Sequence, residues 1–436
     1  MKKKLIGKLF PNLNQAVAYY STTTFCITLN TISEKEFAEM VANKPDKKYA
    51  ENMSVIWHEM QHHLDHISTL WGQNNIYKLF DAINGRLSLD VNQFAKIIPF
   101  KHEERQLHFN EYYTENYNTV EWKKADGNWI WQLSTGIRFK DTGEPDYDKP
   151  ILFIKFATRQ GQALNRVPLS IAALLETNST KREVDMMFSY IASLDEDTKL
   201  VEKALYERHL FSEIIYNQDW AVYNAAVHLT SNILGLGDLI ESLQISFRVS
   251  HLALNLPHSL ISKIPIDTKK MSAWGDRPEK LMRNNNYGFI FYNLLLNYAP
   301  FFKVDGKFDL PRLLLSNNLP EEKELEDIVA KEMESIIAEY TKQPNFKNDF
   351  TARATEGLKL FRARGIAGAN ASIGDLQEKH GYKPTIIFSD TDFDLEFDTK
   401  RIFSSLPLDD LPIPHWYGVA DILDFKMDEF YEVRGL

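Results

Sequence analysis

The residues with the clearest chemical potential form one short segment, His58-Glu59-Met60-Gln61-His62. Two histidines four residues apart project from the same side of a helix, about one turn from each other, so both imidazoles can reach one metal ion. The glutamate between them can then remove a proton from a water molecule bound to that ion. These residue types predict a catalytic Zn²⁺ site, because zinc accepts neutral imidazoles and leaves one position open to water. The competing interpretation is an ordinary helix whose histidines are solvated or satisfied in the core.

The element that must position these side chains is a helix from about residue 52 to residue 70. Apolar side chains recur there every three or four residues, and neither proline nor glycine occurs between residues 53 and 71. We expect Gly72 to end the helix. The helix therefore has an apolar stripe for burial and a histidine-rich stripe for chemistry. The apolar stripe consists of Ile56, Met60, Leu64, Ile67 and Trp71.

Through this motif the chain resembles the zincin metallopeptidases, and the resemblance covers the motif helix and the strand before it. It implies a zinc-dependent peptidase in which His58 and His62 hold the ion. It also implies that Glu59 acts as general base and then as general acid. In such proteins an edge strand lies beside the helix and pairs with an extended peptide substrate, and residues 22–30 are our candidate for this strand.

The third metal ligand decides the subgroup. Asp65 and Ser68 stand where metzincins have glycine and histidine, so that subgroup is disfavoured. Gluzincin-like proteins take a glutamate from a later helix. Our candidate is Glu176, because a lone carboxylate that ends an apolar helical run needs a cation or strong donors to be buried. Its spacing to Ser179 is similar to that of a gluzincin ligand helix, although Leu175 stands where that pattern has asparagine.

Alternatives to Glu176 remain open. The gap from His62 to Glu176 is longer than is usual for the subgroup, and an inserted β-meander would account for it. Glu176 can instead be a helix-end carboxylate that faces solvent. The other carboxylates that can complete the metal site are those of Glu103, Glu111, Glu115, Glu213 and Glu356.

Further polar residues near the motif have open roles. Asp65 shares the face of His58 and His62, where it can orient a ligand imidazole, bind the metal or be solvated. His66 is better placed than His63 to approach the site, but we expect a structural or substrate-side role for it. Four residues are candidates for stabilising an oxyanion, each more typical of a packed or capped position: His228, Tyr223, His251 and His258.

The wider pattern predicts a helix-rich α+β fold. Residues 14–31 are rich in β-branched and aromatic types and indicate one or two strands. Residues 95–160 alternate short apolar runs with glycine turns, which favours a small antiparallel meander inserted after the zincin-like helix. We divide the chain into residues 1–94, 95–160, 161–344 and 345–436. The strands expected in the meander are 120–122, 129–133 and 151–156, and the later helices are 183–194, 200–228, 325–340 and 352–363.

Composition limits the class of protein. The chain has 436 residues, 44% hydrophobic residues and a net charge of -10, which disfavours a nucleic-acid partner. Its single cysteine, Cys26, excludes a cysteine-rich zinc site and favours a reducing compartment, where we expect a buried thiol. The most apolar stretch, 289–302, is too interrupted to cross a membrane, so we expect a cytoplasmic protein.

Two functions from different classes follow from these patterns. The first is a cytoplasmic zinc metallopeptidase that acts on a protein or peptide substrate, with Zn²⁺ held by His58, His62 and Glu176. The second is a non-catalytic helical interaction protein whose histidine-rich helix binds a structural metal or none. The sequence leaves the substrate and the oligomeric state open.

Overall fold

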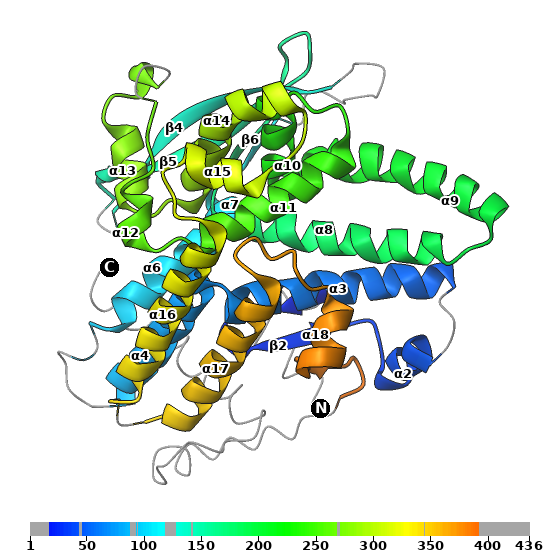
Figure 1. Ribbon diagram of the computed structural model, residues 1–436, viewed down its shortest axis with the longest axis horizontal. Helices are drawn as coiled ribbons and strands as arrows, with labels where there is room; N and C mark the ends of the chain where they lie inside the picture. The colour runs from blue at the N-terminus through cyan, green and yellow to red at the C-terminus, as the bar shows by residue number, and fades with distance from the viewer. Residues whose placement is uncertain are drawn as a thin grey trace.

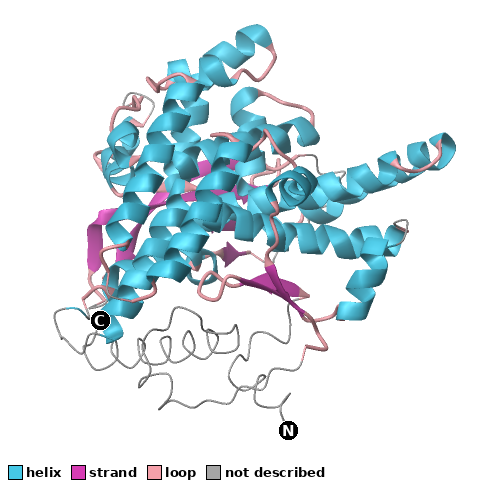
Figure 2. Cartoon of the chain, turned by 60° about the horizontal axis from the view of Figure 1, so that its bottom comes forward, coloured by secondary structure: helices cyan, strands magenta, loops and turns pink. Residues whose placement is uncertain are grey.

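The computed structural model describes residues 17–42, 46–87, 93, 95–117, 128–140, 143–267, 271–343 and 345–391, and helices dominate this part of the chain (Figure 1). Figure 2 shows that the strands form two separate groups among the helices. The α-helices are α2 (Glu34–Ala42), α3 (Lys47–Ser68), α4 (Leu70–Leu87), α6 (Ile97–Leu107), α7 (Phe109–Tyr113), α8 (Ile171–Ala192), α9 (Glu196–His209), α10 (Ala221–Leu234), α11 (Leu239–Asn255), α12 (His258–Ile261), α13 (Arg277–Arg283), α14 (Tyr287–Asp305), α15 (Leu310–Ser316), α16 (Glu322–Tyr340), α17 (Lys347–Arg364) and α18 (Ile373–His380). The strands are β1 (Ala18–Tyr20), β2 (Cys26–Leu29), β3 (Glu115–Asn116), β4 (Ile130–Phe139), β5 (Pro145–Ala157), β6 (Ala163–Pro168) and β7 (Thr385–Ile387).

The three-stranded sheet joins the two ends of the described chain. Its order is β1-β2-β7, with β1 antiparallel and β7 parallel to β2. The strands expected within residues 14–31 are confirmed. The prediction that residues 22–30 form an edge strand is wrong, because β2 has a neighbour on each side and β1 is the edge among the described strands. The C-terminal strand β7 pairs with the other edge of β2, and no local sequence pattern predicts that pairing.

The four-stranded sheet is antiparallel and has the order β3-β6-β5-β4. It confirms the small antiparallel meander, although β6 extends past residue 160. The strand expected at 120–122 lies outside the described residues. One face of β5 packs into the larger apolar core, where Ile154 and Phe156 are fully buried.

Helix α3 is longer than the sequence suggests and ends earlier. It begins at Lys47, where the Asp46 carboxylate accepts a hydrogen bond from the Tyr49 backbone N–H at 2.8 Å. It stops at Thr69, whose extended backbone turns the chain directly into α4. Gly72 therefore does not end the helix, contrary to our prediction. A Cβ at Gly72 would lie 1.8 Å from the His66 carbonyl oxygen, so glycine is needed for the close approach of α4 to α3.

Two large apolar cores lie on either side of the α3–α8 pair. One lies between α3, α4, α17 and the three-stranded sheet, and the other is centred on α10, α11 and α14. The helices expected near 325–340 and 352–363 are confirmed as α16 and α17. The helix expected over 200–228 is instead divided into α9 and α10, with the short turns η2 (Leu210–Ile215) and η3 (Gln218–Trp220) between them. No described helix is long and apolar enough to span a bilayer.

Candidate metal centre

The motif histidines face a second long helix. α3 and α8 pack along each other (Figure 1), and α8 begins at Ile171, well before the helix expected from residue 183. Glu176 therefore lies in the second turn of α8, not at a helix end. This position directs its carboxylate to the imidazoles of His58 and His62 on α3.

The three candidate ligand atoms form an almost equilateral triangle. His58 Nε2 lies 3.2 Å from His62 Nε2 and 3.3 Å from Glu176 Oε2, and His62 Nε2 lies 3.5 Å from Glu176 Oε2. Two ligand atoms bound about 2.05 Å from a tetrahedral zinc ion are roughly 3.3 Å apart. The triangle therefore has the size of one face of a zinc tetrahedron, and the group could hold one metal ion.

The burial of these side chains also fits a metal site with an open position. The exposed fractions are 12% for His58, 16% for His62 and 23% for Glu176, so solvent reaches the group from one side. Glu176 Oε2 itself is enclosed and accepts no well-directed hydrogen bond. The His58 and His62 nitrogens at 3.3 and 3.5 Å are poorly directed donors for this oxygen, whereas a cation between the three side chains would satisfy it.

The charges around the site favour a cation. Burial opposes ionisation of Glu176, but the adjacent imidazoles of His62 and His58 outweigh it and lower the Glu176 pKa to about 2. Burial likewise opposes the charged form of His58, yet the carboxylates of Glu176 and Glu183 raise the His58 pKa well above its usual value. The carboxylates thus draw positive charge into the site, as a proton on His58 or as a metal ion.

Glu183 is the site residue that the sequence reasoning missed. Its Oε2 lies 3.4 Å from His58 Nδ1, the ring nitrogen that faces away from the triangle. A carboxylate in this position fixes the ring orientation and presents Nε2 as the ligand. Glu183 follows Glu176 by seven residues, or two helical turns, so both lie on one face of α8. Extending the expected helix back to residue 171 would have revealed this pairing.

Glu59 lies beside the triangle, not in it. Its side chain is 7% exposed, and burial raises its pKa, while the charges of His58 and His62 act in the opposite direction. The backbone amide of Tyr20 on β1 also approaches the Glu59 carboxylate and favours its ionised form. A raised pKa makes a carboxylate a stronger base, which suits a group that must accept and return a proton beside the candidate metal site.

Asp65 has a different role from any that we predicted. It is fully buried, and it contacts neither His58 nor His62. One carboxylate oxygen lies 3.1 Å from Arg364 and 3.2 Å from His251, and the other accepts a hydrogen bond from Asn178 at 2.8 Å. Asn178 lies on α8, His251 on α11 and Arg364 on α17, so these contacts link three helices to Asp65 on α3. Solvation of Asp65 and orientation of a ligand imidazole by it are therefore wrong predictions.

The other candidate ligands lie away from the triangle or in contacts of their own. Glu103 accepts hydrogen bonds from Trp71 and Lys78. Glu115 is bound to Arg166. Glu213 and Glu356 are exposed and do not belong to the group, and the side chain of Glu111 is outside the description.

The remaining histidines of α3 have structural partners. His63 Nδ1 is 3.0 Å from the Tyr382 hydroxyl. His66 Nδ1 is 2.7 Å from the Tyr20 hydroxyl, and its Nε2 is 2.9 Å from Asn75 Oδ1. Both rings are buried, and neither joins the ligand triangle.

Of the four candidates for an oxyanion stabiliser, Tyr223 alone borders the site. Its ring centre lies 6.2 Å from that of His58, and the charge of Glu176, followed by burial, raises the pKa of its hydroxyl. His228 Nε2 donates a hydrogen bond to the Ile215 carbonyl at 2.8 Å within an aromatic cluster, and His251 belongs to the Asp65 network. His258 is exposed and contacts Asn285.

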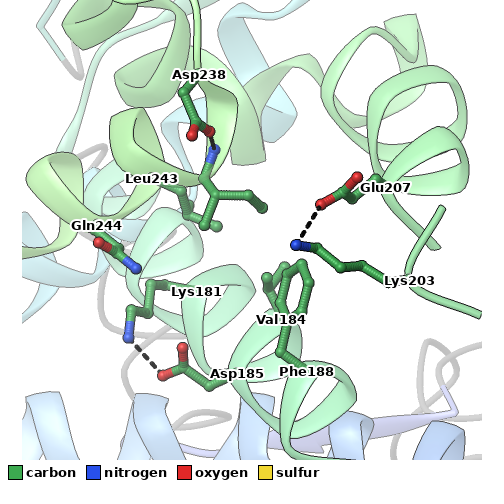
Figure 3. A pocket seen from close by; sticks show the side chains of 10 residues that line it. Lys181, Val184, Asp185, Phe188, Lys203, Glu207, Asp238, Leu243 and Gln244 are labelled. Atoms are coloured by element: carbon green, nitrogen blue, oxygen red, sulfur yellow. Dashed lines mark hydrogen bonds and ion pairs between the residues drawn. The ribbon is translucent and has the colours of Figure 1, made fainter. Parts of the chain in front are cut away.

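A hollow of about 270 Å³ lies on the side of α8 turned away from the triangle (Figure 3). Four of its charged side chains form two pairs, Lys181 with Asp185 and Lys203 with Glu207, and the fifth, Asp238, accepts hydrogen bonds from the first turn of α11. Val184 and Phe188 line its apolar part. Because each of these charged side chains already has a partner, none of them requires a ligand in the hollow.

Cys26 is buried in β2, as expected. Burial raises the pKa of its thiol to about 11, and the thiol donates a hydrogen bond to the Thr24 carbonyl at 3.3 Å. A thiol in this state is a poor nucleophile.

Comparison with known proteins gives no relative: no family model, no curated protein and no solved structure matches the chain. The assignment of a function therefore depends on the geometry of the site.

Buried neutral histidines make the stability of the fold sensitive to acid. Burial lowers the pKa values of His66, His228 and His251 to about 4 each and that of His63 to about 3, so the unfolded chain binds more protons than the folded one between pH 4 and 6.5. Stability should fall as pH decreases from 7 to 5, by on the order of 1–2 kcal/mol for each histidine. The pKa of His58 is raised, so protonation of His58 favours the folded state and offsets part of this loss.

Urea unfolding at pH 7 and pH 5 measures this effect. A variant His228→Phe should show a smaller difference between the two pH values, since one of the four protonation steps is removed. Equal unfolding free energies at both pH values would contradict the prediction.

Proposed function

We propose that the chain is a zinc-dependent metallopeptidase in which His58, His62 and Glu176 hold Zn²⁺. The observation that carries this proposal is the triangle of ligand atoms with sides of 3.2, 3.3 and 3.5 Å. When bound, zinc supplies a Lewis acid that polarises the substrate carbonyl and lowers the pKa of water. The resemblance of the motif to the zincins, with a gluzincin-type third ligand, agrees with this donor set.

Glu59 moves the proton in the proposed reaction. Its carboxylate takes a proton from the attacking water as the water oxygen bonds to the carbonyl carbon. The same carboxyl group then delivers that proton to the amide nitrogen as the carbon–nitrogen bond breaks. The raised pKa of Glu59 helps both transfers, because it brings the proton affinity of the carboxylate closer to that of its partners.

One edge of β1 has no strand beside it in the described part of the chain, and this free edge supports a peptide as the substrate. Asn30 donates to the Val17 carbonyl at 3.0 Å and Ser21 donates to the Cys26 carbonyl at 3.1 Å, so backbone groups of odd-numbered residues in β1 face β2. Those of Ala18 and Tyr20 face the other way, and no described strand pairs with them. Since the Tyr20 amide approaches Glu59, an extended peptide added to this edge would pass the catalytic carboxylate.

Tyr223 is our candidate for stabilising the oxyanion. Its ring lies beside His58, and its raised pKa keeps the hydroxyl protonated and able to donate a hydrogen bond. A donor aimed at the developing oxygen charge lowers the barrier of amide hydrolysis.

Metal analysis tests the foundation of this proposal. Protein purified without a His tag should contain close to one zinc per chain. His62→Ala should abolish stoichiometric binding, because two remaining ligands from different helices hold zinc weakly. His258→Ala, which removes an exposed histidine far from the triangle in the fold, is the matched control and should keep its zinc.

The same measurement separates the two function classes. A non-catalytic interaction protein without a metal would show no stoichiometric zinc in the wild type. One with a structural metal would bind zinc but hydrolyse no peptide in a mixed peptide library. Either result would reject the peptidase assignment.

A further inference from the structure

The side chain of Tyr20 connects the free edge of β1 to the motif helix. Its hydroxyl lies 2.7 Å from His66 Nδ1, and the opposite ring nitrogen of His66 lies 2.9 Å from Asn75 Oδ1. His66 and Asn75 are each 1% exposed, so water does not compete for these bonds. Glu59 and His66 are seven residues apart on α3 and therefore share one stripe of the helix, over which Tyr20 lies.

The turn after β1 is attached to the same histidine. Phe25 has a backbone φ of 59°, a left-handed conformation that a bulky residue rarely adopts. Its ring stacks on the His66 ring with centres 5.3 Å apart and planes 7° from parallel, and the Arg353 guanidinium covers it at 4.4 Å. Packing on His66 thus holds this turn in a conformation that the backbone alone disfavours.

We propose that His66 is a positioning residue: through Tyr20 and Phe25 it clamps the β1–β2 hairpin to α3, so that the free edge of β1 stays aligned with Glu59. This inference rests on the proposed peptidase function. It gives a role to a buried histidine that neither binds the metal nor touches substrate. The clamp predicts that loosening Tyr20 reduces catalysis without removing zinc.

The test compares two buried tyrosine hydroxyls that bond to the same helix. Tyr20→Phe removes the bond to His66 and retains the ring and the backbone amide. Tyr382→Phe removes hydroxyl contacts to His63 at 3.0 Å and to the Met60 carbonyl at 3.1 Å, but keeps the bond between Tyr20 and His66 and the packing of the His63 ring on Tyr20. Both variants should have melting temperatures a few degrees below that of wild type. A difference in activity between them therefore does not reflect a difference in overall stability. His66→Ala removes both contacts of the clamp, the bond to Tyr20 and the stacking on Phe25. If the His66→Ala protein does not fold, the result for Tyr20→Phe decides whether the clamp exists.

Two readouts are measured on zinc-loaded protein. In Tyr20→Phe, amide hydrogen exchange over residues 17–22 should become at least tenfold faster and kcat/KM should fall about tenfold, with zinc content unchanged. Tyr382→Phe should keep both values within twofold of wild type. The clamp is refuted if exchange in Tyr20→Phe equals that of wild type, or if Tyr382→Phe changes both readouts equally. A wild type that hydrolyses no peptide rejects the proposed function, while the exchange result still decides whether the clamp exists.

Discussion

Replacing Glu59 with glutamine should abolish peptide hydrolysis while leaving zinc bound. Glutamine has nearly the same shape as glutamate but cannot take a proton from water, so the loss in kcat should be on the order of 10²–10⁴. Zinc content should stay near one per chain, because Glu59 does not belong to the ligand triangle. Steady-state hydrolysis of a peptide mixture, with metal analysis of the same sample, measures both quantities.

The buried carboxylate Glu103 provides the matched control. It accepts hydrogen bonds from Trp71 and Lys78 in the same part of the fold, and it lies outside the triangle. Glu103→Gln should reduce stability and leave kcat close to that of wild type. Full activity in a zinc-loaded Glu59→Gln protein would refute the role of Glu59 as general base. Comparing which cellular proteins are shortened by wild type and by Glu59→Gln would then identify the substrate.

The sequence predicted the part of the site that local geometry determines. His58 and His62 share one helical face whatever the rest of the chain does, and their imidazoles do meet. Glu176 was predicted from a cost argument: a carboxylate among apolar residues requires a partner. Its position relative to α3 could not be derived, because it depends on how α8 packs along α3.

The missed features all depend on contacts between distant segments. Glu183 was not predicted as a site residue, because the predicted helix began at residue 183 and so did not contain Glu176. β7 pairs with β2 across more than three hundred residues of sequence, and nothing in its three residues specifies that partner. Asp65 was placed on the face of His58 and His62, and its burial against α8, α11 and α17 was missed, because periodicity gives the direction of a side chain but not what packs against it.

The Asp65 network is the clearest example, and its disruption should have the largest effect on stability. Asp65 is the carboxylate that faces the buried guanidinium of Arg364, and it also contacts His251, Asn178 and Gln61. Asp65→Ala leaves Arg364 with an uncompensated charge at 2% exposure, so we expect a loss of about 3–5 kcal/mol in the free energy of unfolding. Urea denaturation monitored by circular dichroism measures it. Glu39→Ala, which removes an exposed partner of Lys35, should change nothing measurable.

A double variant separates the buried charge from the lost packing. Arg364→Met removes the positive charge and fills much of the same volume, so Asp65→Ala combined with Arg364→Met should be less destabilised than the sum of the two single variants. Because the network lies one turn beyond His62 on α3, the double variant should also retain zinc if it folds. Strict additivity would mean that Asp65 and Arg364 do not depend on each other. The stability of the four-helix junction would then come from its apolar packing and from the other hydrogen bonds of Asp65, and the ion pair between Asp65 and Arg364 would add nothing to it.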